Sequence, residues 1–133
     1  MKTILTIAAT SVLVSGCGFA ARSPEMYRDD TKAVLDTKAN DIRACYDGVL
    51  KETPGVGGKV TVKFEVETEQ GKIVNVAVDK PNTTAPDPVA ECVTKNISGL
   101  GLTPPDKRVG QATFVWDFSA PAPGVYSSPA PKS

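Results

Sequence analysis

Alternation of apolar and polar residues predicts three strands in this chain. Residues 60–67 place apolar side chains at every second position, with charged or hydroxyl side chains between them. This is the period of a strand with one buried face. Residues 73–79 repeat the pattern after the turn-forming residues 69–72, so the two segments are predicted to form an antiparallel hairpin. In residues 112–119, aromatic side chains that share one face predict a third strand: Phe114, Trp116 and Phe118.

Helical spacing predicts two helices. In residues 29–52 apolar side chains recur every three or four positions, which places them on one stripe of a helix. The stripe is weakest near residues 37–40, where a break is an alternative, and it ends at a proline-glycine turn. Residues 87–98 form the second predicted helix, with Asp87 as its cap and Pro88 in its first turn.

The predicted order of elements is helix, strand, strand, helix, strand. A two-stranded hairpin is not stable alone in water, so the third strand and the two helices must cover it. The sequence therefore predicts an α+β domain over residues 29–119, with a three-stranded antiparallel sheet in one layer and two helices in the other. Residues 120–133 are rich in Pro, Ser and Ala and are predicted to be a disordered tail.

The N-terminus has the pattern of an export signal. A positively charged start precedes an uncharged apolar run over residues 3–14, and a run of about a dozen residues is too short to span a bilayer. The run ends in Val14-Ser15-Gly16-Cys17, which resembles the bacterial lipobox. We therefore predict removal of residues 1–16 and acylation of Cys17, whose acyl chains would hold the protein stably on a membrane. The alternative is an ordinary secretory signal followed by a chance cysteine.

The lipidated segment, residues 17–28, is predicted to be a short tether of mainly small and polar residues. It is too short to cross the periplasm, so we expect the domain to lie close to the membrane that holds Cys17. By analogy with other bacterial lipoproteins, an Asp after the cysteine would favour the inner membrane. Gly18 stands there instead, which favours the outer membrane, facing the periplasm.

The amino-acid composition limits which ligands and reactions are expected for this protein. Lys plus Arg and Asp plus Glu number 15 each, so no net charge attracts nucleic acid. Histidine, the commonest general base and metal ligand, is absent from the sequence. The carboxylates considered for catalysis have no partner at a diagnostic spacing: Asp79, Asp87, Glu91 and Asp106. We therefore expect neither an enzyme nor a cofactor, metal site or small-molecule substrate, and a small envelope enzyme is the least favoured alternative.

Cys45 and Cys92 remain once Cys17 is assigned to the lipid. Each lies on or beside the apolar stripe of a predicted helix, in a chain predicted to reach an oxidising compartment. We predict a structural disulfide between them. Two buried free thiols are one alternative, and a redox pair is another, although redox pairs usually have the closer spacing C-x-x-C.

Several segments together resemble a known family. They are Ile42-Arg43-Ala44-Cys45-Tyr46, residues 58–64, Gly71-Lys72-Ile73, Ala90-Glu91-Cys92-Val93, Pro104-Pro105 and residues 114–118. This combination, within about residues 34–119, resembles the C-terminal domain of the gliding-motility AgmX/PglI type, a branch of the TonB C-terminal-like fold. The resemblance implies that fold and implies that Cys45 pairs with Cys92. The chain departs from the family at Leu102-Thr103, where an aromatic residue is usual, and at Trp116, where proline is usual.

The favoured function is that of an envelope lipoprotein that binds or scaffolds another envelope protein, in a gliding-motility or envelope complex. TonB itself has an uncleaved membrane helix and a long spacer, which this chain replaces with a lipid signal and a short tether, so the energy-transducing role is not implied. The last strand is predicted at a sheet edge, where a partner segment can add hydrogen bonds. Its outward side chains are Thr113, Val115 and Asp117. A purely structural envelope component is the alternative.

Overall fold

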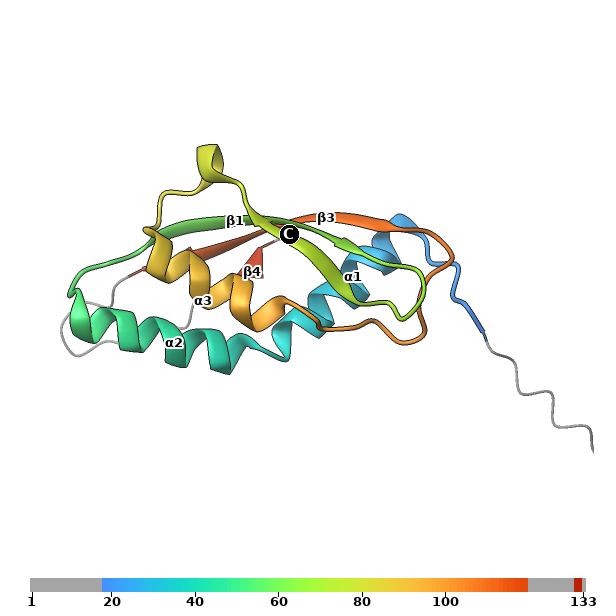
Figure 1. Ribbon diagram of the computed structural model, residues 1–133, viewed down its shortest axis with the longest axis horizontal. Helices are drawn as coiled ribbons and strands as arrows, with labels where there is room; N and C mark the ends of the chain where they lie inside the picture. Colours follow the sequence, from blue (N-terminus) through green and yellow to red (C-terminus); the bar gives the residue numbers. More distant parts are fainter. Residues whose placement is uncertain (1–17, 120–130, 133) are drawn as a thin grey trace, which may run out of the picture.

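The structure, a computed structural model, describes residues 18–119 and 131–132. The predicted signal peptide, residues 1–16, and Cys17 lie outside the described residues. The helices and strands are, in chain order, α1 (Pro24–Asp36), α2 (Ala39–Glu52), β1 (Gly58–Val66), β2 (Ile73–Val78), the 3₁₀ helix η1 (Lys80–Asn82), α3 (Asp87–Ile97), β3 (Gly110–Phe118) and β4 (Pro131–Lys132) (Figure 1).

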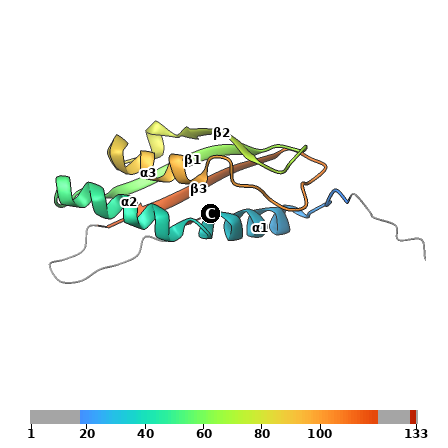
Figure 2. The same cartoon turned by 60° about the horizontal axis from the view of Figure 1, so that its bottom comes forward.

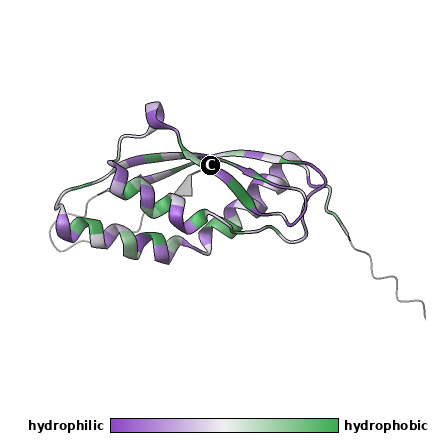
Figure 3. Ribbon diagram, in the orientation of Figure 1, coloured by the Kyte–Doolittle hydropathy of each residue, from purple (hydrophilic) through white to green (hydrophobic). Residues whose placement is uncertain are grey.

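The strands form one antiparallel sheet in the order β2-β1-β3-β4. Helices α1, α2 and α3 lie on one side of this sheet (Figures 1 and 2), which confirms the predicted α+β class. The three predicted strands form the antiparallel sheet β2-β1-β3, to which the two-residue β4 is added at the edge of β3. Along the helices hydrophilic and hydrophobic residues alternate, whereas η1 on the other side is hydrophilic (Figure 3). The predicted aromatic stripe of β3 is buried in the core between the layers: Phe114, Trp116 and Phe118.

The β1–β2 turn shows why this hairpin forms. Gly71 has φ of +71°, and a Cβ atom there would lie 2.2 Å from the Leu102 carbonyl oxygen, so a side chain would be both strained and excluded. The Glu67 carboxylate accepts hydrogen bonds from the N–H groups of Glu69, Gln70 and Lys72. These bonds, that from Lys72 first, lower the pKa of Glu67 below its ordinary value. The turn is therefore fixed by a charged acceptor and by a glycine.

The first predicted helix is divided in two. α1 starts at Pro24, five residues before residue 29, because Ser23 caps it and accepts the N–H of Met26. The helical path is interrupted at Thr37 and Lys38, whose N–H groups donate to the carbonyls of Val34 and Leu35. The described residues therefore contain three α-helices, where the sequence predicts two.

The folded unit also begins before residue 29. The Ala20 N–H donates to Pro105 O at 2.9 Å, and the Lys107 N–H donates to Ala20 O at 3.1 Å. The Arg22 side chain is only 5% exposed and lies against Asp106, which is 1% exposed. Residues 20–28, predicted as part of a tether, are thus part of the fold, and α1 begins within them at Pro24.

Cys45 of α2 and Cys92 of α3 form a disulfide, as predicted. The bond joins two helices that lie side by side on the helical face of the sheet (Figure 1). It settles the pairing against the alternative of two free thiols. None of the helices in the described part of the chain has the length and apolar character needed to cross a membrane.

Candidate partner-binding edge and groove

At alternate residues of β3, the backbone N–H and C=O groups point away from β1, toward the outer edge of the sheet. In β1, the backbone groups of Thr61 and Lys59 point away from β3. The Thr61 N–H donates to Thr83 Oγ1, and the Lys59 N–H donates to Thr84 Oγ1. Residues opposite each other in an antiparallel ladder either both bond across it or both point away. Val115 and Asp117 are opposite Thr61 and Lys59, so their N–H and C=O groups point outward.

The same alternation extends toward the start of β3. The β1–β3 register is regular from Gly110 to Phe118, so Gln111 and Thr113 also direct their N–H and C=O groups outward. Among the described residues, no strand pairs with β3 on that side at either position. We call the outer side of residues 110–113 the open edge.

Part of the predicted edge is occupied by the chain itself. Val115 is paired with Lys132, and Trp116 with Pro131, in the antiparallel pair β3–β4. β4 therefore covers the predicted edge at Val115, and the prediction of a disordered tail over residues 120–133 is wrong for Pro131–Lys132. Thr113 has an exposed side chain and lies on the open edge, whereas the side chains of Val115 and Asp117 are half-buried.

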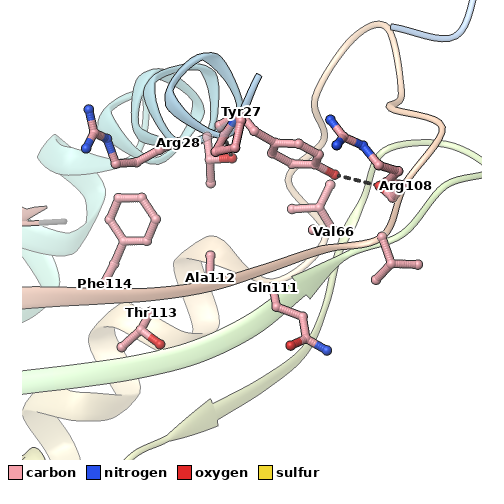
Figure 4. A pocket seen from close by; sticks show the side chains of 12 residues that line it. Tyr27, Arg28, Val66, Arg108, Gln111, Ala112, Thr113 and Phe114 are labelled. Carbon is pink, nitrogen blue, oxygen red and sulfur yellow. Dashed lines mark hydrogen bonds between the residues drawn. The ribbon is translucent and has the colours of Figure 1, made fainter. Parts of the chain in front are cut away.

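A groove runs between α1 and the open edge. It has a volume of about 380 Å³, and its lining residues come from α1, β1, β3 and the segment before β3. Ala112 and Phe114 point from β3 toward α1, while Gln111 and Thr113 point to the other side of the sheet (Figure 4). The strand contributes an apolar floor, and Thr31 and Arg28 line the side formed by α1.

Tyr27 closes one end of the groove. Its hydroxyl donates to the Arg108 carbonyl at 3.2 Å (Figure 4), and the Arg22 guanidinium lies 5.8 Å from the ring centroid, a cation–π distance. Burial raises the pKa of Tyr27 above its ordinary value, and the charge of Asp106 adds to this effect. The ring is therefore a neutral, fixed wall of the groove.

The Tyr27 ring packs directly on the backbone of Gly110. A Cβ atom at Gly110 would lie 2.6 Å from Cε1 of that ring, so Gly110→Ala must displace Tyr27. We expect the free energy of unfolding to fall by about 1–3 kcal/mol, as for overpacked sites, measured by urea titration. Gly48→Ala is the control, because nothing lies within 4 Å of a Cβ atom there, and in α2 it should instead stabilise by up to about 1 kcal/mol. Equal stability of Gly110→Ala and the unmodified protein would contradict the contact.

The carboxylates considered for catalysis have structural partners. Asp79 pairs with Lys63 at 3.3 Å, Glu91 with Lys95 at 3.4 Å, and Asp87 with Lys80. Hydrogen bonding from the Asn82 side chain, with a further contribution from Lys63, lowers the pKa of Asp79. Within residues 18–119 and 131–132, no group of three His, Cys, Asp or Glu side chains is placed to hold a metal ion.

The groove itself was not predicted, because the first turns of α1, residues 24–28, were assigned to the tether. The signal that would have found it is Ser23-Pro24, a cap followed by a proline at the first helical position. Comparison of the chain with protein families, with curated proteins and with solved structures gives no match. The resemblance to the AgmX/PglI and TonB C-terminal domains thus stays a prediction.

Proposed function

We propose that this protein is a lipid-anchored envelope protein that binds an extended segment of another envelope protein along the open edge of β3. The observation that carries the proposal is that β4, an extended segment, already pairs with this side of β3. The chain's own residues thus occupy one part of an edge whose next two outward-pointing positions, Gln111 and Thr113, have no strand beside them among the described residues. Strand addition at such an edge is a general mode of peptide recognition.

The groove defines which kind of segment fits. An added strand would place alternate side chains toward α1, over the floor formed by Ala112 and Phe114. Main-chain hydrogen bonds to Gln111 and Thr113 would give affinity, and small or apolar side chains in the groove would give selectivity. The ligand class is therefore an extended, largely apolar polypeptide segment, not a folded surface.

The lipid anchor rests on the N-terminal sequence. A positively charged start, a short apolar run and Val14-Ser15-Gly16-Cys17 together have the pattern of a lipoprotein signal. The Cys45–Cys92 disulfide is consistent with export, because such bonds persist in oxidising compartments. An outer-membrane position facing the periplasm follows from Gly18 as a further part of the proposal.

Thr113→Pro tests the binding mode. Proline removes the Thr113 N–H, which points outward and is not used by β1, so the sheet should tolerate the change as edge strands do. Peptides selected for binding to the unmodified protein from a displayed random library should lose binding to Thr113→Pro by at least about tenfold, the equivalent of 1.4 kcal/mol. Isothermal titration measures the affinity, and circular dichroism with thermal unfolding checks the fold.

Thr113→Ala is the matched control, because it removes the side chain and keeps the N–H, and it should bind as the unmodified protein does. Amide hydrogen exchange gives a second measurement. The Gln111 and Thr113 amides should become protected on binding, while those of Ala112 and Phe114, which face β1, should change little. Peptides that bind Thr113→Pro and the unmodified protein equally would exclude this edge as the site.

A further inference from the structure

One end of the molecule is fixed close to Cys17. The Ala20 N–H and C=O are both bonded to the segment 105–107, and the Arg22 N–H donates to Asp106 Oδ2 at 2.8 Å. Ala20 also forms a parallel bridge with Asp106. The chain is therefore held by the fold from Ala20 onward, three positions after Cys17.

Three residues span at most about 10 Å when fully extended. If Cys17 carries acyl chains, the segment next to Ala20 must lie within that distance of the bilayer interface. A long flexible tether would let the domain turn freely over the membrane, but the short segment between Cys17 and Ala20 does not. The same end of the domain must face the lipid at all times.

That end carries exposed apolar side chains. The exposed large apolar residues among the described ones are Phe19, Met26 and Val109, exposed by 53%, 56% and 55% respectively. Phe19 directly precedes Ala20, and Val109 follows the segment bonded to it. Lys107 and Arg108, which directly precede Val109, are basic and exposed. The Arg108 guanidinium also donates to the Arg22 carbonyl and lies 3.6 Å from Asp106 Oδ1, while 62% of its side chain remains exposed. We call Phe19, Lys107, Arg108 and Val109 the tip.

We propose that the tip rests on the bilayer, with Phe19 and Val109 inserted at the boundary between headgroups and acyl chains and with Lys107 and Arg108 at the headgroup phosphates. This inference rests on the proposed acylation of Cys17. Apolar side chains beside basic ones are the usual composition of surfaces that bind the membrane interface. The tip contributes too little apolar area to bind alone, so it acts as an orienting contact beside the lipid.

The orientation has a consequence for the partner. Arg108 and Val109 also line the groove, so the end of the groove that Tyr27 closes is the end nearest the lipid. A segment bound there must run close to the membrane surface. The partner that fits is therefore one with an extended stretch next to its own membrane anchor or transmembrane part.

The test uses the full acylated protein on vesicles of phosphatidylethanolamine and phosphatidylglycerol. A fluorescent maleimide is attached to Val109→Cys or, at the opposite end of the molecule, to Glu52→Cys at the end of α2 (Figure 1). With Cys17 acylated and Cys45 bonded to Cys92, the introduced thiol is the reactive one. Lipids spin-labelled at the interface then quench fluorophores near them.

We expect the label at residue 109 to lose most of its fluorescence and the label at residue 52 to keep it. The unacylated Cys17→Ser protein, mixed with the same vesicles, should show no quenching at either position. Protein that floats with the vesicles but shows no quenching at residue 109, or equal quenching at both positions, would overturn the orientation while leaving the anchor intact. Protein whose mass shows no acyl group, and which does not float, would overturn the anchor and the orientation together.

Discussion

Replacing Cys45 and Cys92 together by alanine is expected to lower the free energy of unfolding by about 4 kcal/mol. The two residues are 47 positions apart in the chain. A cross-link that closes a loop of this length lowers the conformational entropy of the unfolded chain and so raises its free energy by about 4 kcal/mol. A domain of this size has a total stability of only about 5–10 kcal/mol. Urea titration of the unmodified and substituted proteins, monitored by far-ultraviolet circular dichroism, measures the difference.

Reduction with dithiothreitol distinguishes the contribution of the disulfide bond from that of the cysteine side chains. Cys92 is buried, so its replacement by alanine also removes a sulfur atom from a packed site. Reduction breaks the bond but leaves that sulfur atom in place. The unmodified protein should lose stability on reduction, and the doubly substituted protein should be indifferent to the reductant. A reduced protein as stable as the oxidised one would show that the bond contributes nothing to the fold.

The strands were predictable because their signal is local. Alternation in β1 and β3 places Val60, Val62, Phe114 and Trp116 on one face, and all four are buried in the core. The turn at Gly71 has its own local signature. The interruption at Thr37–Lys38 falls where the apolar stripe is weakest, so the break considered as an alternative for residues 37–40 is the arrangement found; the residue types alone did not decide it, because Thr and Lys are compatible with helix interiors at a modest cost.

The contacts that bring Ala20 and Arg22 into the fold could not be predicted from local pattern, whereas the start of α1 has the local signal Ser23-Pro24. Ala20 and Arg22 are held by hydrogen bonds with residues 104–108, more than 80 positions away in the chain, and no periodicity records such a contact. Small and polar residues with one proline are typical of a linker, so the sequence favoured a tether. The candidate site depends on this error, because α1 forms one wall of the groove.

The edge was predicted in outline and not in detail. The sequence placed Thr113, Val115 and Asp117 on the outward face of the last strand, and the hydrogen bonds of β1 show that their backbone groups also point outward. Pairing of Val115 with Lys132 lies beyond local reasoning, because a proline-rich segment carries almost no strand signal. The structure thereby moves the open edge toward Gln111 and Thr113.

Asp106→Ala is expected to destabilise the fold by about 3–5 kcal/mol, the usual cost of removing one partner from a buried charge pair. The Asp106 carboxylate accepts the N–H groups of Arg22 at 2.8 Å and Arg108 at 3.0 Å. It also faces the buried Arg22 guanidinium, 3.8 Å from Nη1. Among the described residues, that Nη1 atom has no hydrogen-bond partner of its own, so it would lose its neighbouring carboxylate, and Arg22 would keep only the ion pair between its Nε and Asp30 Oδ2 at 2.6 Å. Urea titration measures the loss, and trypsin cleavage after Arg22 should become faster.

Asp36→Ala is the matched control. Asp36 also pairs with a basic residue, Lys32 at 2.8 Å, but both side chains are about two-fifths exposed. Exposed helical pairs of this kind contribute about 0.3–0.5 kcal/mol, so this variant should unfold nearly as the unmodified protein does. Equal effects of the two substitutions would mean that Asp106 does not hold the N-terminal segment.

The same carboxylate should make stability fall at low pH. Burial raises the pKa of Asp106, but the N–H groups of Arg22 and Arg108 and the charge of Arg108 lower it further, so the net pKa lies below the ordinary 3.8. A group with a lowered folded-state pKa stabilises above its unfolded value and loses that contribution as pH falls toward the folded value. We therefore expect the urea midpoint to decline from about pH 4.5 downward, more steeply in the unmodified protein than in Asp106→Asn. Parallel declines in both proteins would assign the acid sensitivity to other carboxylates, such as Glu67 and Asp79, whose pKa values are also lowered.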